Sequence, residues 1–164
     1  LRRPNWLVLR TFSTALRLAA HRVGYGIGHS DIIAALEKLR LPYNLPSFSQ
    51  AAANAALAHS DQLLAQIPEL LSERDQVYRA LSEHPYLRVW PSDSNFVYAQ
   101  LSDLGLASLE ATEQNQGLAK VFQMLKAKGT LLRHTGGGIR FSIGTAAETR
   151  RPLANFQQVL VGKA

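Results

Sequence analysis

The sequence contains no cysteine and no long apolar run. Without cysteine the chain can hold neither a disulfide framework nor a thiolate nucleophile, and nothing in it requires an oxidising compartment. No window approaches the roughly 18 uninterrupted apolar residues of a membrane-spanning helix, and the first residues lack the apolar core of a signal peptide. We therefore expect a soluble, cytoplasmic protein without a membrane partner.

The sequence also lacks the spacing of a metal site. Its five histidines stand at positions 21, 29, 59, 84 and 134. None has the regular spacing to another histidine, or the neighbouring carboxylates, that would complete a metal-ligand set. We therefore expect no bound metal. Gly136-Gly-Gly138 precedes a strand pattern and lacks the lysine and hydroxyl residue of a phosphate loop, so it predicts a plain hairpin turn.

Lys and Arg outnumber Asp and Glu by 18 to 12, which gives a formal net charge of +6. The excess is uneven, because residues 1–40 carry +5, residues 41–100 carry −3 and residues 101–164 carry +4. No block of about five like charges occurs, and the aromatic residues do not alternate with the basic ones as in a groove for single-stranded nucleic acid. We therefore expect solvated charges and no nucleic-acid partner.

The first half of the chain predicts two strands and then helices. Residues 6–12 and 22–28 are short runs of strand-forming residues, and apolar residues at helical spacing follow from Ser30 to Arg40. Two prolines exclude regular structure from residues 41–46. Ser47-Phe-Ser-Gln50 fits a capping box that opens a long helical stretch up to residue 84, with a break or kink at Pro68.

The second half predicts strands at 87–90, 95–100, 130–134 and 139–143, and a helix at 117–128 that Gly129 ends. Residues 101–116 read as a loop with at most a short helix. Ile139, Phe141 and Ile143 alternate with Arg140, which predicts one buried face and Arg140 on the other. Thr145 and Glu148 fit a capping box for a last helix. This order of elements indicates a layered α/β domain, with the two N-terminal strands left over from another sheet.

Ser13 and Arg22 flank the short loop between the first two predicted strands. A hydroxyl and a guanidinium at these positions can converge on a phosphate, because the arginine fork donates two charge-assisted hydrogen bonds at once. Taken alone the pair is a weak signal, since a serine and an arginine nine positions apart are common.

The wider sequence strengthens that interpretation. Several further stretches stand in a recognisable order: Thr11-Phe-Ser13, Leu18-Ala-Ala, Arg22-Val-Gly-Tyr25, Leu41-Pro-Tyr-Asn-Leu before Gln50-Ala-Ala, Ser94-Asn-Phe-Val-Tyr98, Gly129-Thr-Leu-Leu-Arg133 and Ile139-Arg-Phe-Ser-Ile-Gly-Thr145. In this order and approximate spacing the chain resembles the histidinol-phosphate aminotransferases. The resemblance covers nearly the whole chain and matches only about the C-terminal half of such an enzyme.

The resemblance implies an α/β chain of fold type I, the C-terminal part of a pyridoxal-phosphate-dependent transferase. Residues 1–45 would be a remnant of the large cofactor-binding domain, residues 46–84 a connecting long helical segment, and residues 85–164 a small C-terminal α/β domain. The family transfers an amino group between histidinol phosphate and 2-oxoglutarate or glutamate. Its members are homodimers, so a homodimer that binds a phosphorylated amino alcohol or an amino acid is expected.

The resemblance also implies site residues. Thr11, Ser13 and Arg22 would bind the phosphate of the pyridoxal 5′-phosphate cofactor. Arg140 would bind the substrate carboxylate, and Arg133 would help to hold the phosphate of histidinol phosphate. Tyr25 and Asn44 also match motif positions and are interpreted as mainly structural.

The departures from the family pattern bear on the chemistry. Thr14 stands where the family has the lysine that forms a Schiff base with the cofactor and moves the substrate proton. Ala20 replaces a usual glycine. The family's aspartate for the pyridine nitrogen, its stacked aromatic residue and its Asn-Pro loop lie upstream of residue 1. Covalent cofactor attachment and activity of this chain alone are therefore not expected.

Two alternatives remain open at this point. The chain could be a non-catalytic relative that acts as a binding or dimerisation module, with phosphate or cofactor held without a covalent bond. It could also belong to the phosphothreonine-type decarboxylase branch, which shares the fold and the cofactor.

Overall fold

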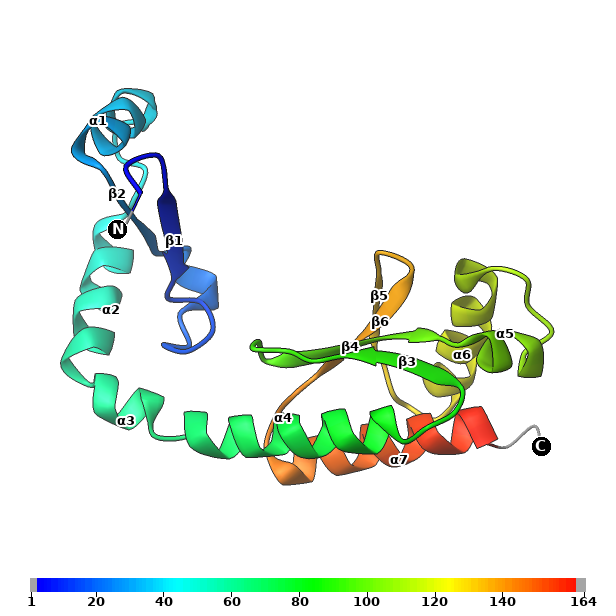
Figure 1. The fold of residues 1–164 in the computed structure, drawn as a ribbon. Helices are drawn as coiled ribbons and strands as arrows, with labels where there is room; N and C mark the ends of the chain where they lie inside the picture. The colour runs from blue at the N-terminus through cyan, green and yellow to red at the C-terminus, as the bar shows by residue number, and fades with distance from the viewer. Residues whose placement is uncertain (1–2, 162–164) are drawn as a thin grey trace. The chain divides into compact units, whose positions relative to one another are not determined.

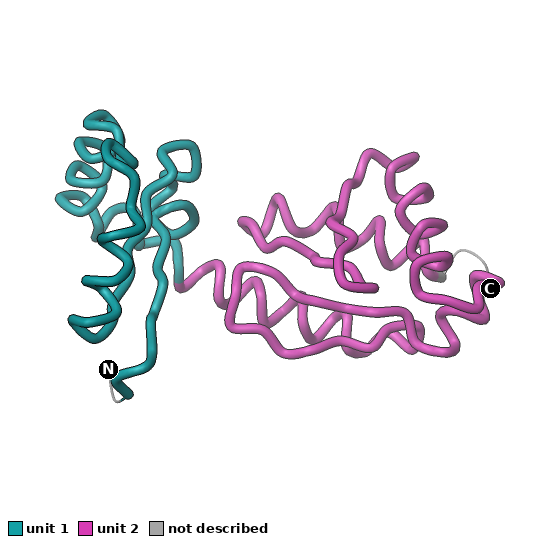
Figure 2. The backbone as a smooth tube through the Cα atoms, turned by 90° about the horizontal axis from the view of Figure 1, so that it is seen from above, with its two compact units in different colours: residues 1–67 teal, residues 68–164 magenta. Residues whose placement is uncertain are grey.

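A computed structural model describes residues 3–161 of the chain (Figure 1). The chain divides into two compact units, residues 1–67 and residues 68–164, drawn in teal and magenta in Figure 2. The outermost residues of the predicted segments 1–45 and 85–164 lie outside the described range. Within residues 3–161, no helix combines the length and the apolar character needed to cross a membrane.

Unit 1 begins with a two-stranded antiparallel sheet that confirms the two predicted strands. Strand β1 (Leu7–Thr11) pairs with β2 (Gly24–Gly28), with Leu7 opposite Gly28 and Thr11 opposite Gly24. A 3₁₀ turn, η1 (Ala19–His21), lies in the loop between them. Helices α1 (Ser30–Leu39), α2 (Ser47–Ala58) and α3 (Ser60–Leu64) follow.

The core of unit 1 is small. Phe12, Val23 and Ala53 form its cluster of buried apolar residues, against which Leu16, Leu18 and Leu45 pack. Many large apolar side chains of this unit stay exposed, among them Leu9, Ile27, Leu39, Tyr43 and Phe48. Several large apolar side chains of the β1–β2 ribbon and of the helices after it are therefore exposed to solvent.

Of two expectations for the helical stretch, the capping box at Ser47 was wrong and the break at Pro68 is confirmed. The N-cap residue of α2 is Pro46 and not the predicted Ser47. No side chain accepts a hydrogen bond from the first turn of this helix. Gln50 Nε2 instead donates to the Leu45 carbonyl at 3.0 Å. The predicted break at Pro68 is confirmed, because the helical stretch is interrupted at residues 65–66 and Pro68 lies in the first turn of the next helix, α4 (Ile67–Ser82), where its missing N–H would have no helical partner.

Unit 2 is a four-stranded antiparallel sheet packed against helices. Its strands are β3 (Leu87–Trp90), β4 (Phe96–Leu101), β5 (Arg133–Thr135) and β6 (Gly138–Ser142), in the order β3-β4-β6-β5. Its helices after α4 are α5 (Asp103–Ser108), α6 (Gln114–Ala127) and α7 (Ala146–Val161). Helix α6 begins three residues earlier than predicted. The prediction missed its first turn because the residues there are polar and show no apolar periodicity.

The core of unit 2 lies between one face of this sheet and the helices. Val97, Ile139 and Phe141 of the sheet share a buried cluster with residues of α4, α6 and α7, such as Val121 and Phe156. The predicted alternation is confirmed, since Ile139, Phe141 and Ile143 are buried and Arg140 projects from the other face. Gly136 and Gly137 both have positive φ, as the predicted hairpin turn requires.

Two ionisable groups of unit 2 have shifted pKa values. Glu148 accepts hydrogen bonds at 2.9 Å from the Thr145 backbone N–H and hydroxyl, which confirms the predicted capping box and lowers the pKa of Glu148. Burial lowers the pKa of His84, whose Nδ1 accepts from the Tyr86 backbone N–H at 3.3 Å. His84 Nε2 is buried and has no hydrogen-bond partner among the described residues.

We predict that acidification destabilises unit 2 in two steps. Below the ordinary histidine pKa of about 6.5, the unfolded chain takes up a proton at position 84 that the folded chain resists, so the free energy of unfolding falls with pH. The slope stays below about 1.4 kcal/mol per pH unit, the value for one full proton. The Glu148 contribution is present above its unfolded pKa and is lost as pH falls through its folded pKa.

Urea denaturation between pH 7.5 and 5.5 measures the first step. His84→Asn is the matched control, since an asparagine oxygen accepts the same backbone N–H and does not titrate. An unchanged slope in His84→Asn would contradict the assignment to His84.

Candidate functional site

The loop that joins β1 to β2 brings Thr11, Ser13 and Arg22 together. The Phe12 N–H donates to the Val23 carbonyl at 3.0 Å, which extends the pairing of the two strands by one step. The Leu18 N–H donates to the Phe12 carbonyl at 3.0 Å and folds the loop back on itself. Thr11, Ser13 and Arg22, here called the phosphate cluster, therefore lie at the base of the loop, where the chain enters and leaves it.

The phosphate cluster is joined by hydrogen bonds. Thr11 Oγ1 donates to Ser13 Oγ at 2.8 Å and accepts the Ser13 backbone N–H at 3.0 Å. Arg22 Nη1 lies 3.4 Å from Ser13 Oγ and donates to the Ala19 carbonyl at 2.9 Å. Two hydroxyls and a guanidinium thus converge at a surface site, which is the donor set that a phosphate group needs. The residues present fit the phosphate of a cofactor.

Arg22 adopts an unusual backbone conformation. Its φ is +56°, in the left-handed region that favours glycine, and it caps the 3₁₀ turn η1. A residue with a side chain costs of order 1 kcal/mol there. A glycine would adopt this backbone conformation without strain. The arginine is therefore not explained by the backbone, and its side chain is the feature to account for.

Thr14 follows the phosphate cluster directly. It is exposed in the bend after Ser13, and its carbonyl accepts the Arg17 N–H at 3.1 Å. The position predicted for the cofactor lysine therefore lies next to the groups predicted for the cofactor phosphate. A threonine hydroxyl supplies no amine, so the residues present do not fit covalent attachment of an aldehyde cofactor.

In unit 2, Arg133 and Arg140 are direct neighbours across two strands. Arg133 on β5 is opposite Arg140 on β6 in the antiparallel register. Directly opposite residues hold their Cβ atoms about 5 Å apart, so both arginine side chains project from the same face of the sheet. The Arg140 guanidinium carbon lies 3.8 Å from the centre of the Phe96 ring. Arg140 Nε is buried without a hydrogen-bond partner among the described residues.

Sequence reasoning missed the aromatic residues beside this arginine pair. Trp90 on β3, Tyr98 on β4, Arg140 and Arg133 are opposite one another in successive strands, so they share the face of the sheet that the helices do not cover. The Trp90 and Tyr98 rings lie 5.6 Å apart. The alternation within residues 87–90 and 95–100 could have placed these aromatic residues on the arginine face.

Tyr25 and Asn44 make local contacts. The Tyr25 ring stands edge-on to Phe12, with ring centres 5.9 Å apart. Asn44 Oδ1 accepts a hydrogen bond from Arg40 Nη1 at 3.1 Å. Their structural interpretation stays a prediction.

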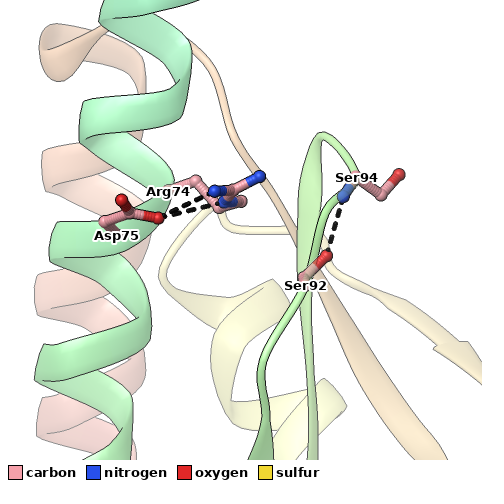
Figure 3. A network of polar contacts seen from close by, with 4 residues as sticks. All are labelled: Arg74, Asp75, Ser92 and Ser94. Carbon is pink, nitrogen blue, oxygen red and sulfur yellow. Dashed lines mark hydrogen bonds and ion pairs between the residues drawn. The ribbon is translucent and has the colours of Figure 1, made fainter.

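Two open hollows lie outside these sites. One, of about 530 Å³ in unit 1, is lined mainly by apolar residues, among them Phe12, Tyr25 and Leu57. The other, of about 340 Å³, lies between α4 and the β3–β4 turn. There Arg74 donates to Asp75 Oδ1 from Nε at 3.1 Å and from Nη2 at 2.9 Å, while the Ser94 N–H donates to Ser92 Oγ (Figure 3). Because Arg74 is already paired with a carboxylate, this hollow has no strong preference for an anion.

Comparison with known proteins identifies a family. The sequence matches the family described as aminotransferase class I and II over residues 2–156. It is 53% identical over 156 residues to the histidinol-phosphate aminotransferase of Trichodesmium erythraeum (strain IMS101), in an alignment covering 95% of this chain and 42% of that protein. The chain thus spans about two fifths of the length of the curated relatives it matches.

Solved structures give the same result for the fold. The histidinol-phosphate aminotransferase from Sinorhizobium meliloti, in complex with pyridoxal-5′-phosphate, superposes with a TM-score of 0.75 at 26% identity, covering 98% of this chain and 42% of that one. The L-threonine-O-3-phosphate decarboxylase from Porphyromonas gingivalis has a TM-score of 0.76 at 19% identity, covering 96% of this chain and 47% of that one. The second likeness shows the fold alone.

We predict that Arg22→Gly separates binding from stability. The change removes the guanidinium and relieves the positive φ, so affinity for inorganic phosphate falls by about tenfold while the free energy of unfolding changes by less than about 1 kcal/mol. Isothermal titration and urea denaturation measure the two quantities.

Arg10→Ala is the matched control, because Arg10 is an exposed arginine on β1 and its loss removes the same charge. It should weaken phosphate binding by less than about twofold, as expected for a screened surface charge. Equal losses in the two variants would show that net charge, and not the phosphate cluster, binds the anion.

Proposed function

Because the chain belongs to the aminotransferase class I and II family, we propose that it carries part of the site of a pyridoxal-phosphate-dependent histidinol-phosphate aminotransferase. The family resemblance and the α/β architecture of fold type I predicted from the sequence are confirmed. The single observation that carries the proposal is the convergence of Thr11, Ser13 and Arg22 beside the residue at the lysine position.

In this proposal the phosphate cluster holds the cofactor phosphate. Ser13 Oγ and Thr11 Oγ1 donate hydrogen bonds, and Arg22 adds a charge-assisted one, which together offset much of the charge of a phosphate dianion. Pyridoxal phosphate, when bound, supplies the aldehyde and the electron-withdrawing ring that amino-group transfer requires.

The arginine pair of unit 2 binds the substrates. Arg140 receives the carboxylate of glutamate or 2-oxoglutarate, since a planar fork matches a planar anion with two oxygens. Its guanidinium is oriented by the Phe96 ring, and its Nε has no competing protein partner among the described residues. Arg133 binds the phosphate of histidinol phosphate. The reaction is amino-group transfer between these two substrates.

Thr14 limits what this chain does alone. A threonine hydroxyl does not replace the lysine amine, either as a covalent attachment point or as the group that moves the substrate proton. The chain alone is therefore inactive in the proposal, and binding of phosphate or cofactor is separate from catalysis.

Thr14 also favours a second candidate function, in which the chain is a non-catalytic binding or dimerisation module of the same family. In this case the phosphate cluster binds pyridoxal phosphate or phosphate without a covalent bond. A homodimer and a cytoplasmic location remain predictions. So does the assignment of residues 1–45, 46–84 and 85–164 to a large-domain remnant, a helical connection and a small domain.

We predict that the 164-residue chain, supplied with pyridoxal phosphate, histidinol phosphate and 2-oxoglutarate, forms no glutamate above the rate without protein. Thr14→Lys should also form none, because one lysine does not replace the groups that the longer relatives bring to the site. A coupled glutamate assay and the visible absorption of a lysine-bound cofactor are the two measurements.

Ala15→Lys is the matched control, as it places a lysine on the next exposed residue. Turnover by the unaltered chain at an ordinary enzyme rate, about 1 s⁻¹ or more, would overturn the account of Thr14. A visible band in Thr14→Lys but not in Ala15→Lys, without added polypeptide, would overturn the expectation that one lysine is not enough.

A further inference from the structure

Strand β5 carries Arg133 at the edge of the sheet, directly after Leu132, which packs against the buried cluster of unit 2. It is three residues long, all three are exposed, and it is the edge strand of the order β3-β4-β6-β5. Its register places Arg133 opposite Arg140 and Thr135 opposite Gly138. Because the first of these pairs places two like-charged side chains directly opposite each other, it is unfavourable for the pairing of β5 with β6. A contact between the β5–β6 turn and the rest of the sheet would therefore stabilise the position of β5.

Tyr98 makes that contact from β4. Its hydroxyl donates to the Gly136 carbonyl at 2.7 Å, and the Thr135 carbonyl is a second acceptor at 3.3 Å. Both carbonyls belong to the end of β5 and the turn that follows it. Tyr98 lies on β4, directly opposite Arg140 on β6. Its side chain therefore reaches across β6 to the turn of the β5–β6 hairpin.

The neighbours of Tyr98 keep its ring in this position. A Cβ atom at Gly138 would lie 2.5 Å from both Cζ and Oη of Tyr98, so the ring occupies space that only glycine leaves free. On the β3 side the Trp90 ring lies 5.6 Å away. Gly138 on one side and Trp90 on the other thus orient the Tyr98 side chain so that its hydroxyl points to the turn.

Arg140 does not depend on this contact. It lies in β6, which pairs with β4 from Ala99 to Phe96, and its guanidinium stacks on Phe96, two residues from Tyr98. Arg133 lies in β5, which is an edge strand and pairs with β6 on one side only. Loss of the Tyr98 hydroxyl should therefore displace Arg133 and spare Arg140.

We propose that Tyr98 is a positioning residue that holds Arg133 in place by tying the β5–β6 turn to β4, and so sets the preference of this face for a phosphate-bearing substrate. The proposal rests on the proposed function, in which Arg133 binds phosphate and Arg140 binds carboxylate. Tyr98 touches neither anion; it acts through the hairpin.

The test is Tyr98→Phe in the whole 164-residue chain, with backbone amide exchange and arginine Nε–H titrations followed by NMR. Inorganic phosphate stands in for the substrate phosphate and glutarate for the dicarboxylate partner. We expect amide exchange in β5 to accelerate about three- to tenfold, as for loss of one hydrogen bond. Phosphate affinity at Arg133 should weaken by a similar factor, while glutarate affinity at Arg140 stays within about twofold.

Tyr78→Phe is the matched control, because it removes a hydroxyl of the same unit at the hollow beside Pro91 and Ser92, by the turn at the other end of β4. It should change neither β5 exchange nor the ratio of the two affinities. A general loss of stability in Tyr98→Phe would lower both affinities together, and that result would overturn the positioning role. So would unchanged exchange in β5.

The two proposals fail in different ways. If Arg133 of the unaltered chain does not respond to phosphate, the phosphate assignment in the proposed function is wrong. If Arg133 responds and the response survives Tyr98→Phe at full strength, the phosphate assignment stands and the role of Tyr98 is overturned.

Discussion

The pairing of β4 with β6 is the interaction on which unit 2 depends. These two central strands place Val97, Ala99, Ile139 and Phe141 on one face, where all four are buried and all but Ala99 share a cluster with residues of helices α4, α6 and α7. The same register places Tyr98 and Arg140 on the other face. Because strand side chains alternate, the burial of the apolar set fixes the orientation of the arginine. A shift by one residue would bury Arg140 and expose Phe141, so the core enforces the geometry of the arginine face.

Unit 1 has no comparable core, and its site depends on a loop instead. The convergence of Thr11, Ser13 and Arg22 follows from two backbone hydrogen bonds of Phe12 and from the positive φ of Arg22. Thus the two groups of residues proposed to bind anions are held in place in different ways. One lies on a strand held by a buried sheet, and the other lies in an exposed loop held by local hydrogen bonds.

Much of the sheet of unit 2 could be predicted, because Ile139, Phe141 and Ile143 alternate strictly and Gly136 and Gly137 mark the turn. The start of α6 could not, because its first turn is polar and hydrogen-bonds through side chains, as Gln114 does with both backbone groups of Leu101. At Ser47 a capping pattern was misleading, since the preceding proline already had the extended backbone that a cap needs. The phosphate cluster was found through family resemblance, as a serine and an arginine nine residues apart carry little information alone. Tyr98 was missed as a contact of the hairpin because its acceptors, the carbonyls of residues 135 and 136, lie far away in sequence.

The unequal cores of the two units have a thermodynamic consequence. Among the described residues, the buried apolar cluster of unit 1 has three members, whereas that of unit 2 has sixteen. Since apolar burial is the main favourable term in folding, unit 1 opens at a lower cost than unit 2. A ligand that binds only the closed form of such a weak unit raises its stability by RT ln(1 + [L]/Kd). If phosphate binds the phosphate cluster as proposed, its occupancy adds to the folding free energy of unit 1, and the folded fraction of this unit rises with ligand concentration.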